Sequence, residues 1–364
     1  MNGLEARIRA EIERDGPMPL DRYMALALTD PVHGYYMGRD PLGAGGDFIT
    51  APEISQMFGE LLGLWLADCW QRAGEPRDAI LAELGPGRGT LMADALRAIG
   101  RAAPAMLEHA ALWLVEASPA LKAMQRDRLE GAGARWAGTV EDLPDGPLFL
   151  IANEFFDALP VRQVARRGEG LAERAVGLTG GELAFVDAPL ARPLPYDTPE
   201  LADGEVFELC EAGQETAALI GRRIAGQGGA ALIVDYGHGV SAPGDTVQAM
   251  RNHAFHPVLS EPGSADLTAH VDFAVLARAA AGDGAAVHGP IGQRQLLLRL
   301  GIEARLGQLM KNADQATADG LAAGFRRLTD PEFMGHLFKA LAVSPADQLT
   351  PAGFADEDAY SRNA

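Results

Sequence analysis

The sequence predicts an α/β protein organised around an open parallel sheet, and three observations carry that prediction. An apolar run at 80–84 is followed at once by a glycine-rich turn and then by a helical pattern. Two further apolar runs, at 110–115 and 148–152, each end abruptly in polar residues. Because ligands of open α/β sheets bind beyond the carboxyl ends of the strands, these ends predict one shared binding site.

The first 78 residues are predicted to form a helical arm or lid in front of this sheet. Leu4, Ile8 and Ile12 recur at helical spacing, and the apolar positions of 56–72 predict a longer helix. Between these helices lies a long glycine-rich loop that includes Asp47. Such a loop is costly to order, so we expect it to cover the site or to line it.

The glycine-rich turn distinguishes among nucleotide-binding motifs. Gly85, Gly87 and Gly89 follow Glu83 in the pattern E-x-G-x-G-x-G. A phosphate loop would require a lysine after the last glycine, and a dinucleotide fingerprint would read G-x-G-x-x-G. The observed pattern resembles the first motif of S-adenosylmethionine-dependent methyltransferases, in which the glycine turn lies under the amino-acid end of the cofactor. The glycines allow the backbone to approach such a ligand closely.

The next two strand ends are predicted to hold the nucleoside of that cofactor. Glu116 closes the run 110–115, where the resemblance implies an acid on the ribose hydroxyls. Asp142 follows a third strand at 135–140 and is a candidate for binding the exocyclic amine of adenine. A solvated turn is the alternative interpretation of Asp142.

A second polar cluster follows the strand at 148–152. Asn153, Glu154 and Asp157 come directly after it, with two phenylalanines between them. At the carboxyl end of a parallel strand, these side chains are expected to project toward the reacting groups. Asn153 is predicted to contact the cofactor, whereas Glu154 and Asp157 are predicted to face the substrate.

The rest of the chain is divided by changes of pattern. Residues 161–228 alternate short strands with glycine-rich turns and predict an inserted α+β region. Residues 79–160 and 229–305 form the predicted core. The last part, 306–364, is predicted to be a helical segment.

Composition restricts the class of protein and its partners. The 364 residues are 48% hydrophobic, enough for a large core, and carry a formal net charge of -19. That charge argues against nucleic acid as a partner, because phosphates attract basic surfaces, and it is compatible with a cationic substrate. Two distant cysteines predict neither a disulfide nor a metal site. No apolar run is long enough to insert into a membrane, and the acidic N-terminal stretch does not resemble a targeting peptide.

Five motifs together resemble the MidA-like methyltransferases, a family that includes a mitochondrial arginine methyltransferase assisting complex I assembly. They are GDFITAPEISQMFGE at 46–60, ELGPGRGTL at 83–91, ANEFFDALP at 152–160, DYG at 235–237 and GSADLTAHVDF at 263–273. The first and third are specific to the family, and the set spans most of the chain in the family's order.

The resemblance implies a seven-stranded, Rossmann-like class I methyltransferase sheet that uses S-adenosylmethionine. It also implies symmetric dimethylation of an arginine in the large catalytic-arm subunit of complex I, the NADH-quinone oxidoreductase. The mitochondrial members carry a transit peptide that this sequence does not show. We therefore expect a bacterial, cytoplasmic protein.

Arginine methylation requires carboxylates, because a guanidinium stays protonated, with a pKa of about 12.5 or above. Carboxylates can bind it through paired hydrogen bonds, localise its charge away from the reacting nitrogen and help to take up the departing proton. We expect Glu154 and Asp157 to do this, with Asp47, Glu53 or Asp266 from the flanking loops as helpers. The alternative is structural, with Glu154 bonded to backbone amides and Asp157 capping a helix.

Two other classes of function are compatible with the same sheet. One is an assembly factor that binds a partner without transferring a methyl group, and cofactor turnover distinguishes it from an enzyme. The other is a dinucleotide-dependent oxidoreductase, which NAD rather than S-adenosylmethionine would stabilise against heat.

Overall fold

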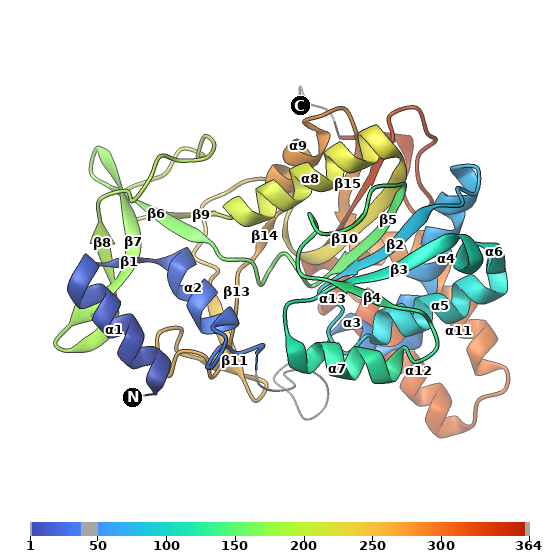
Figure 1. Ribbon diagram of the computed structural model, residues 1–364, viewed down its shortest axis with the longest axis horizontal. Coiled ribbons are helices and arrows are strands. Elements are labelled where there is room, and N and C mark those ends of the chain that lie inside the picture. Colours follow the sequence, from blue (N-terminus) through green and yellow to red (C-terminus); the bar gives the residue numbers. More distant parts are fainter. Residues whose placement is uncertain (1, 38–49, 361–364) are drawn as a thin grey trace.

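The structure, a computed structural model, describes residues 2–37 and 50–360 and has two lobes (Figure 1). The larger one, which we call the sheet lobe, contains the central sheet and the helices on its two faces. The smaller one, the accessory lobe, contains the two N-terminal helices and the strands at the left of Figure 1. The predicted α/β class is confirmed.

The central sheet has the strand order β15-β16-β10-β5-β2-β3-β4, with β14 beside the end of β10. Strands β2, β3, β4, β5 and β10 are parallel, and β16 runs antiparallel between β10 and β15. Within the described residues, the path contains the seven strands that the resemblance implies, and the short β14 makes the sheet eight-stranded. The bounds are β2 Ala79–Leu84, β3 Ala110–Val115, β4 Arg135–Ala137, β5 Leu148–Asn153, β10 Gly229–His238, β14 Val271–Asp272, β15 Ala286–Gly292 and β16 Phe338–Ser344.

Successive residues of these strands alternate between the two faces of the sheet, and both faces are covered. Leu81 and Phe149 pack with helices α4 and α5 on one face, whereas Ile80 and Leu150 pack with α8 and α9 on the other. This explains why the strands are apolar throughout rather than alternating with polar residues. The bounds are α3 Ala51–Ile54, α4 Gln56–Arg72, α5 Thr90–Ala102, α6 Pro104–His109, α7 Pro119–Arg128, α8 Glu211–Gln227 and α9 Phe273–Ala281. In the ranges 2–37 and 50–360, no helix has the length and apolar character needed to cross a bilayer.

The expectation of a purely helical segment over 306–364 is wrong, because β16 lies in the interior of the central sheet. Its register places Leu341 opposite Ile233 of β10, and Ala342 opposite His288 of β15. A short apolar run is ambiguous between helix and strand in a sequence, and here the strand partners are distant. The helices of this part are α10 Gln293–Arg299, α11 Ile302–Met310, α12 Gln315–Thr329 and α13 Met334–Leu337, with a 3-10 turn, η1, at Asp356–Asp358.

The accessory lobe combines three stretches of chain that are far apart in the sequence. The two-residue strand β1 pairs with β7, which attaches the N-terminal helices to the inserted region. Leu20 and Tyr23 of α2 are buried together with Val176 of β7 and Leu267 of β13. The bounds are α1 Gly3–Asp15, β1 Met18–Pro19, α2 Leu20–Thr29, β6 Arg162–Arg167, β7 Gly170–Thr179, β8 Glu182–Ala188, β9 Val206–Leu209, β11 Gln248–Arg251, β12 Ala254–His256 and β13 Asp266–Thr268.

The lobes therefore differ from the domain limits that the sequence predicts. Helix α4 belongs to the sheet lobe rather than to an N-terminal arm, since it shares a core with α5. Helix α8 lies inside the predicted insertion at 161–228 yet covers the sheet. Residues 239–270 lie inside the predicted core, but their apolar side chains pack in the accessory lobe.

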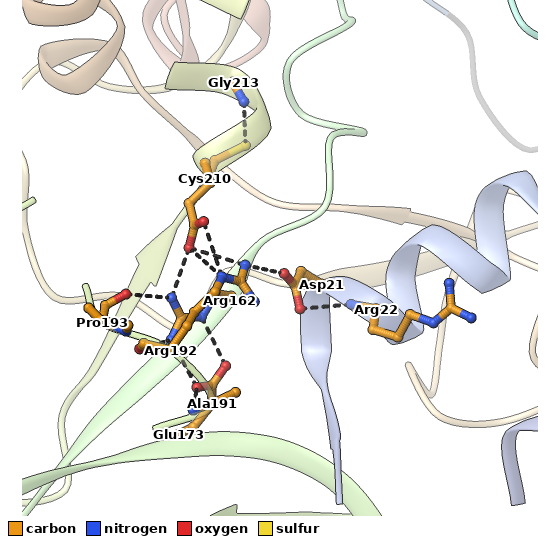
Figure 2. Close-up of polar contacts among 10 residues, drawn as sticks. Asp21, Arg22, Arg162, Glu173, Ala191, Arg192, Pro193, Cys210 and Gly213 are labelled. Carbon is orange, nitrogen blue, oxygen red and sulfur yellow. Dashed lines mark hydrogen bonds and ion pairs between the residues drawn. The ribbon is translucent and has the colours of Figure 1, made fainter. Parts of the chain in front are cut away.

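An ion network around the buried Arg162 connects the two lobes. Figure 2 shows Arg162 of β6 beside Glu173 of β7, and their side chains are joined at 2.9 Å. Arg162 also binds Glu211, the first residue of α8, at 2.8 Å. Arg192 binds Glu211 at 3.1 Å and Asp21 of α2 at 2.6 Å. The network thus attaches the inserted strands to α8 of the sheet lobe and to α2.

Candidate functional site

A cavity of about 390 Å³ lies at the carboxyl ends of β2, β3 and β5, so these strand ends share one site, as the sequence predicts. Its walls are the turns after these strands, together with α3 and the residues after α2. The predicted site residues in its lining are Glu53, Glu83, Gly85, Gly87, Glu116, Asn153 and Glu154.

The glycine turn has the backbone conformation that its sequence requires. Gly85, Gly87 and Gly89 have φ angles of 57°, 53° and 76°, in the left-handed region that favours glycine. A Cβ atom on Gly85 would lie 2.9 Å from the ring of Phe155, which lines the same cavity. Gly89 is the N-cap of α5 and turns the chain into that helix.

Glu83 and Asn153 present unsatisfied acceptors. Both residues are buried in the cavity lining, and neither Glu83 Oε2 nor Asn153 Oδ1 has a hydrogen-bond partner among the described residues. Burial and the nearby Glu116 raise the pKa of Glu83 to about 8. Because buried acceptors normally have a donor, this end of the cavity fits a ligand with a cationic or N–H group.

Glu116 is fixed by two donors at the next strand end. Its Oε1 accepts the backbone N–H of Ser118 at 2.7 Å, and its Oε2 accepts Gln125 Nε2 at 3.1 Å. Burial raises the pKa of this carboxyl group. An ionised carboxylate has about four lone-pair sites, so Glu116 can still accept hydrogen bonds from ligand hydroxyls, as predicted for a ribose.

Gln125 is a site residue that sequence reasoning missed. Its fully buried Nε2 donates to the carbonyl oxygen of Gly87 at 2.8 Å, and its Oε1 accepts Trp136 Nε1 at 2.8 Å. One side chain therefore connects the glycine turn with Glu116. The sequence offers no signal for this role, since a glutamine in a polar helix usually faces solvent.

Asp142 does not take the predicted position at the cavity. It is exposed, and its Oδ2 accepts hydrogen bonds from the backbone N–H and the hydroxyl of Thr139 at 3.0 and 3.1 Å. The cavity wall at this end consists of Gly138, Thr139, Val140 and Glu141. The alternative interpretation, a turn residue, is the one observed, because these local bonds satisfy the carboxylate.

Glu154 lies in the cavity wall and has an unusual backbone conformation. Its φ of 50° is in the left-handed region, where residues other than glycine are uncommon. Its Oε1 accepts the backbone N–H of Ala51 at 3.0 Å and Asn153 Nδ2 at 3.1 Å. Burial raises its pKa to about 7. Glu154 is therefore bonded to a backbone amide and also lines the cavity.

Two other predicted carboxylates lie close to this wall without forming part of it. Asp157 and Asp266 are buried, and Asp266 accepts the hydroxyl of Tyr36 at 2.8 Å. Burial, Asp266 and Asp157 raise the pKa of Tyr36, so these three groups are neighbours. Tyr36 itself lines the cavity and was not predicted. Asp47 lies outside the described residues.

The cavity lining is strongly acidic. Glu53 accepts a hydrogen bond from the hydroxyl of Thr90, the first residue of α5. The acidic side chains of the described lining are Glu53, Glu83, Glu116, Glu141 and Glu154, and its basic side chain is Arg88. Such a charge distribution attracts cationic ligands and stabilises them in a partly desolvated site.

Comparison with known proteins identifies the ligand class. A family model for S-adenosyl-L-methionine-dependent methyltransferases matches residues 61–291. The mitochondrial protein arginine methyltransferase NDUFAF7 of Xenopus tropicalis is 37% identical, over 96% of this chain and 87% of the relative. Human NDUFAF7 is also 37% identical, over 93% of this chain and 82% of the relative. The Drosophila melanogaster homolog is 38% identical, over 94% and 85%.

A solved structure agrees over the whole fold. A protein from Burkholderia thailandensis, determined with bound S-adenosyl-homocysteine, superposes with a TM-score of 0.84 and 30% identity. The match covers 99% of this chain and 96% of that protein. Sequence, fold and the acidic cavity with its glycine turn therefore agree. This chain belongs to the family of S-adenosyl-L-methionine-dependent methyltransferases.

Proposed function

We propose that the protein methylates an arginine side chain of a protein substrate. The observation that carries this proposal is Glu154, a carboxylate in the cavity wall near the buried Asp157. A guanidinium is the side chain that such carboxylates bind best. Relatives named protein arginine methyltransferases support the same residue type.

The cofactor would be held by residues at the three strand ends. S-adenosylmethionine supplies a methyl group on a positively charged sulfur atom. Glu116 would accept hydrogen bonds from the ribose hydroxyls, and the free acceptors of Glu83 and Asn153 would bind the amino group. The glycine turn leaves room for the ligand, because no side chain projects from Gly85 or Gly87.

Glu154 would orient the arginine that accepts the methyl group. Glu154 must be ionised to do so. Its pKa of about 7 lies close to neutral pH, and a guanidinium bound nearby would shift Glu154 toward the ionised form. Paired hydrogen bonds from a guanidinium to one carboxylate fix the plane of the group. A fixed plane directs one nitrogen toward the reaction and removes the entropic cost of finding that orientation.

The methylated nitrogen must also lose a proton. A carboxylate whose pKa lies near neutral pH is suited to accept it, and Glu154 has that property. Burial also raises the pKa of Asp157, to about 6. We infer that Glu154 takes the proton and that Asp157 contributes negative charge behind it.

The substrate that the family resemblance implies is the large catalytic-arm subunit of complex I, and we propose this subunit as the target. We further propose that the reaction takes place in a bacterial cytoplasm. The cysteines Cys69 and Cys210 are both free, which agrees with a reducing compartment. Cell fractionation with an antibody against the protein would test the location.

A labelling experiment tests the function. The protein is incubated with methyl-labelled S-adenosylmethionine and a lysate from cells that lack it, and labelled peptides are sequenced by mass spectrometry. We expect one arginine peptide to carry the label with the wild-type protein and the same peptide to be labelled far more slowly with Glu154→Gln. Reconstituted complex I subunit, added alone, should become labelled at the same arginine.

The outcomes separate the competing functions. Cofactor binding without any labelled protein would support an assembly factor and overturn the proposed enzyme. Label on lysine or on a small molecule would overturn the residue class. Equal labelling by wild type and Glu154→Gln would support methyltransferase activity but contradict the proposed role of Glu154.

A further inference from the structure

Asp235 is a buried carboxylate at the end of β10 to which neither the reaction nor the cofactor site assigns a role. Its side chain is fully inaccessible to solvent. Its Oδ2 accepts the backbone N–H groups of Phe155, Phe156 and Asp157, at 3.1, 2.9 and 3.2 Å. Its Oδ1 accepts the N–H of Tyr236 at 2.9 Å. One oxygen therefore binds three successive amides of the turn that follows β5.

This turn begins where β5 separates from its neighbour. The parallel register of β5 and β10 ends at Asn153, which lies opposite Val234. The backbone N–H of Glu154 still donates to Val234, at 3.0 Å. At Glu154 the chain then turns, with a φ of 50°. The side chain of Asp235 thus replaces the lost strand pairing for the next three residues.

A glutamate in the left-handed conformation is strained and persists only where surrounding contacts determine the conformation. Convergence of three backbone N–H groups on one carboxylate oxygen is such a contact, because buried backbone donors are costly to leave without an acceptor. A carboxylate is itself costly at this depth, where burial and the nearby Asp157 and Glu154 raise its pKa. A leucine at this position would leave these backbone N–H groups without their acceptor, which explains why a polar side chain is buried here.

We propose that Asp235 is a positioning residue. It holds Glu154 in its left-handed conformation and so directs the carboxylate of Glu154, which binds the substrate, toward the cavity. The inference rests on the proposed arginine methylation and deepens it. It assigns the geometry of Glu154 to a residue on the neighbouring strand, 81 positions later in the sequence.

A double-mutant cycle tests this coupling. Asp235→Asn keeps the size of the side chain and one oxygen acceptor, but its amide nitrogen would face a backbone N–H. The cycle compares wild type, Asp235→Asn, Glu154→Gln and the double variant. The matched control is Glu208→Gln, because Glu208 Oε1 in the accessory lobe also accepts two successive amides, from Thr246 and Val247, at 2.9 and 3.1 Å.

Two quantities are measured for each variant. One is kcat/KM for the arginine-containing protein substrate. The other is the equilibrium affinity for an arginine peptide in the presence of S-adenosylhomocysteine, followed by fluorescence anisotropy, which needs no turnover. The affinity for S-adenosylhomocysteine alone serves as a test of the cofactor site.

We expect Asp235→Asn to lower kcat/KM by about 10- to 100-fold, as expected for a displaced catalytic group. In the Glu154→Gln background, the same substitution should lower both quantities less than twofold, since there is no carboxylate left to position. S-adenosylhomocysteine should bind all variants within about twofold of wild type. Glu208→Gln should leave kcat/KM within about twofold, with or without Glu154→Gln.

If Asp235→Asn lowers kcat/KM by the same factor with Glu154 and with Gln at this position, the proposed coupling is wrong. A loss confined to the affinity for S-adenosylhomocysteine would also overturn it. If Asp235→Asn does not fold, Asp235→Glu replaces it in the cycle, because it keeps the charge and displaces the carboxylate by one methylene. The failure of the proposed function is recognised separately, since wild-type protein would then label no arginine.

Discussion

The carboxylates around the cavity differ in their hydrogen-bond donors and in their burial. Thr139 satisfies the exposed Asp142, and two donors fix Glu116. Glu83 is buried and Glu154 is half-buried, and the pKa values of these two groups are raised to about 8 and about 7. A bound cation should favour the ionised form of both groups, because opposite charge offsets the cost of burial.

The pH dependence of the reaction should therefore report Glu154. Binding of a guanidinium needs the ionised carboxylate, so kcat/KM should rise about tenfold per pH unit below pH 7 and level off above it. Initial rates with the arginine substrate between pH 5.5 and 8.5 would show this. In Glu154→Gln the residual rate should lose this rise, whereas an unchanged profile would assign the ionisation to another group.

Gly85 should not tolerate a side chain. In Gly85→Ala the new Cβ would meet the ring of Phe155 at 2.9 Å, at a φ of 57°. We expect cofactor affinity, measured by calorimetry with S-adenosylhomocysteine, to fall by about tenfold or more, since a conformational cost of about 1–3 kcal/mol opposes the bound geometry.

The matched control for this substitution is Gly74→Ala. Gly74 also has a positive φ, of 83°, but a Cβ there meets no atom within 4 Å. It should lower the melting temperature while leaving cofactor affinity unchanged. A similar loss of affinity in both variants would show that general destabilisation, rather than the turn, is responsible.

At the scale of elements, the network around Arg162 is one of the connections between the lobes. Arg162 and Glu173 are both buried, and Glu211 brings the N-terminus of α8 into the same network. Removing one member leaves a buried charge without its partner, which is more damaging than the pair is stabilising. Arg162 of β6 is therefore the central residue of this network.

Arg162→Met should lower the free energy of unfolding by about 3–5 kcal/mol, measured by urea titration. Arg167→Met is the matched control on the same strand, because Arg167 and Asp187 are paired on the surface. Its cost should stay below about 1 kcal/mol. The double variant Arg162→Met/Glu173→Leu should recover part of the loss. Equal effects of the two arginine substitutions would contradict a special role for the buried network.

The sequence predicts the local elements more completely than the contacts between residues that are distant in the sequence. The strand, glycine turn and helix at 79–102 are encoded by adjacent residues, and the cavity confirms that the strand ends meet. Gln125 and Tyr36 were missed because their contacts, with Gly87 and Asp266, are distant in the sequence. For the same reason, no local pattern distinguishes the strand β16 from a helix.

At the scale of the whole molecule, the two lobes meet at the proposed substrate site. Asp266 comes from β13 of the accessory lobe, whereas Asp157 follows β5 of the sheet lobe. The backbone N–H of Ala269 donates to the carbonyl oxygen of Asp157 at 2.9 Å, which joins the lobes at this point.

Stability should depend on pH through the buried carboxyl groups. The pKa of Glu83 is raised from 4.5 to about 8, so between these values the folded chain holds a proton that the unfolded chain has lost. The stabilisation from this group is fully present below pH 4.5 and is lost as pH rises toward 8. His270 and His288 act in the opposite direction, because burial lowers the pKa of each.

Comparing Glu83→Gln with wild type isolates the contribution of the Glu83 carboxyl group to the free energy of unfolding. Glu83→Gln stays neutral at every pH, so its free energy of unfolding relative to wild type should increase between pH 5 and pH 8, by about 2 kcal/mol or more. Urea titrations of both proteins without cofactor, at four pH values, would measure this. The same variant should bind S-adenosylmethionine more weakly. A constant difference across the range would show that Glu83 ionises normally.

The position of β16 also has a consequence for how the chain is made. This strand, 338–344, completes the hydrogen bonding of β10, whose residues 229–238 leave the ribosome roughly a hundred residues earlier. Until it arrives, one side of β10 is an open edge in the middle of an apolar sheet, and such edges pair readily with other chains. Nascent protein therefore passes through an aggregation-prone stage that ends only when its last strand inserts, and chaperone protection would be needed during this interval.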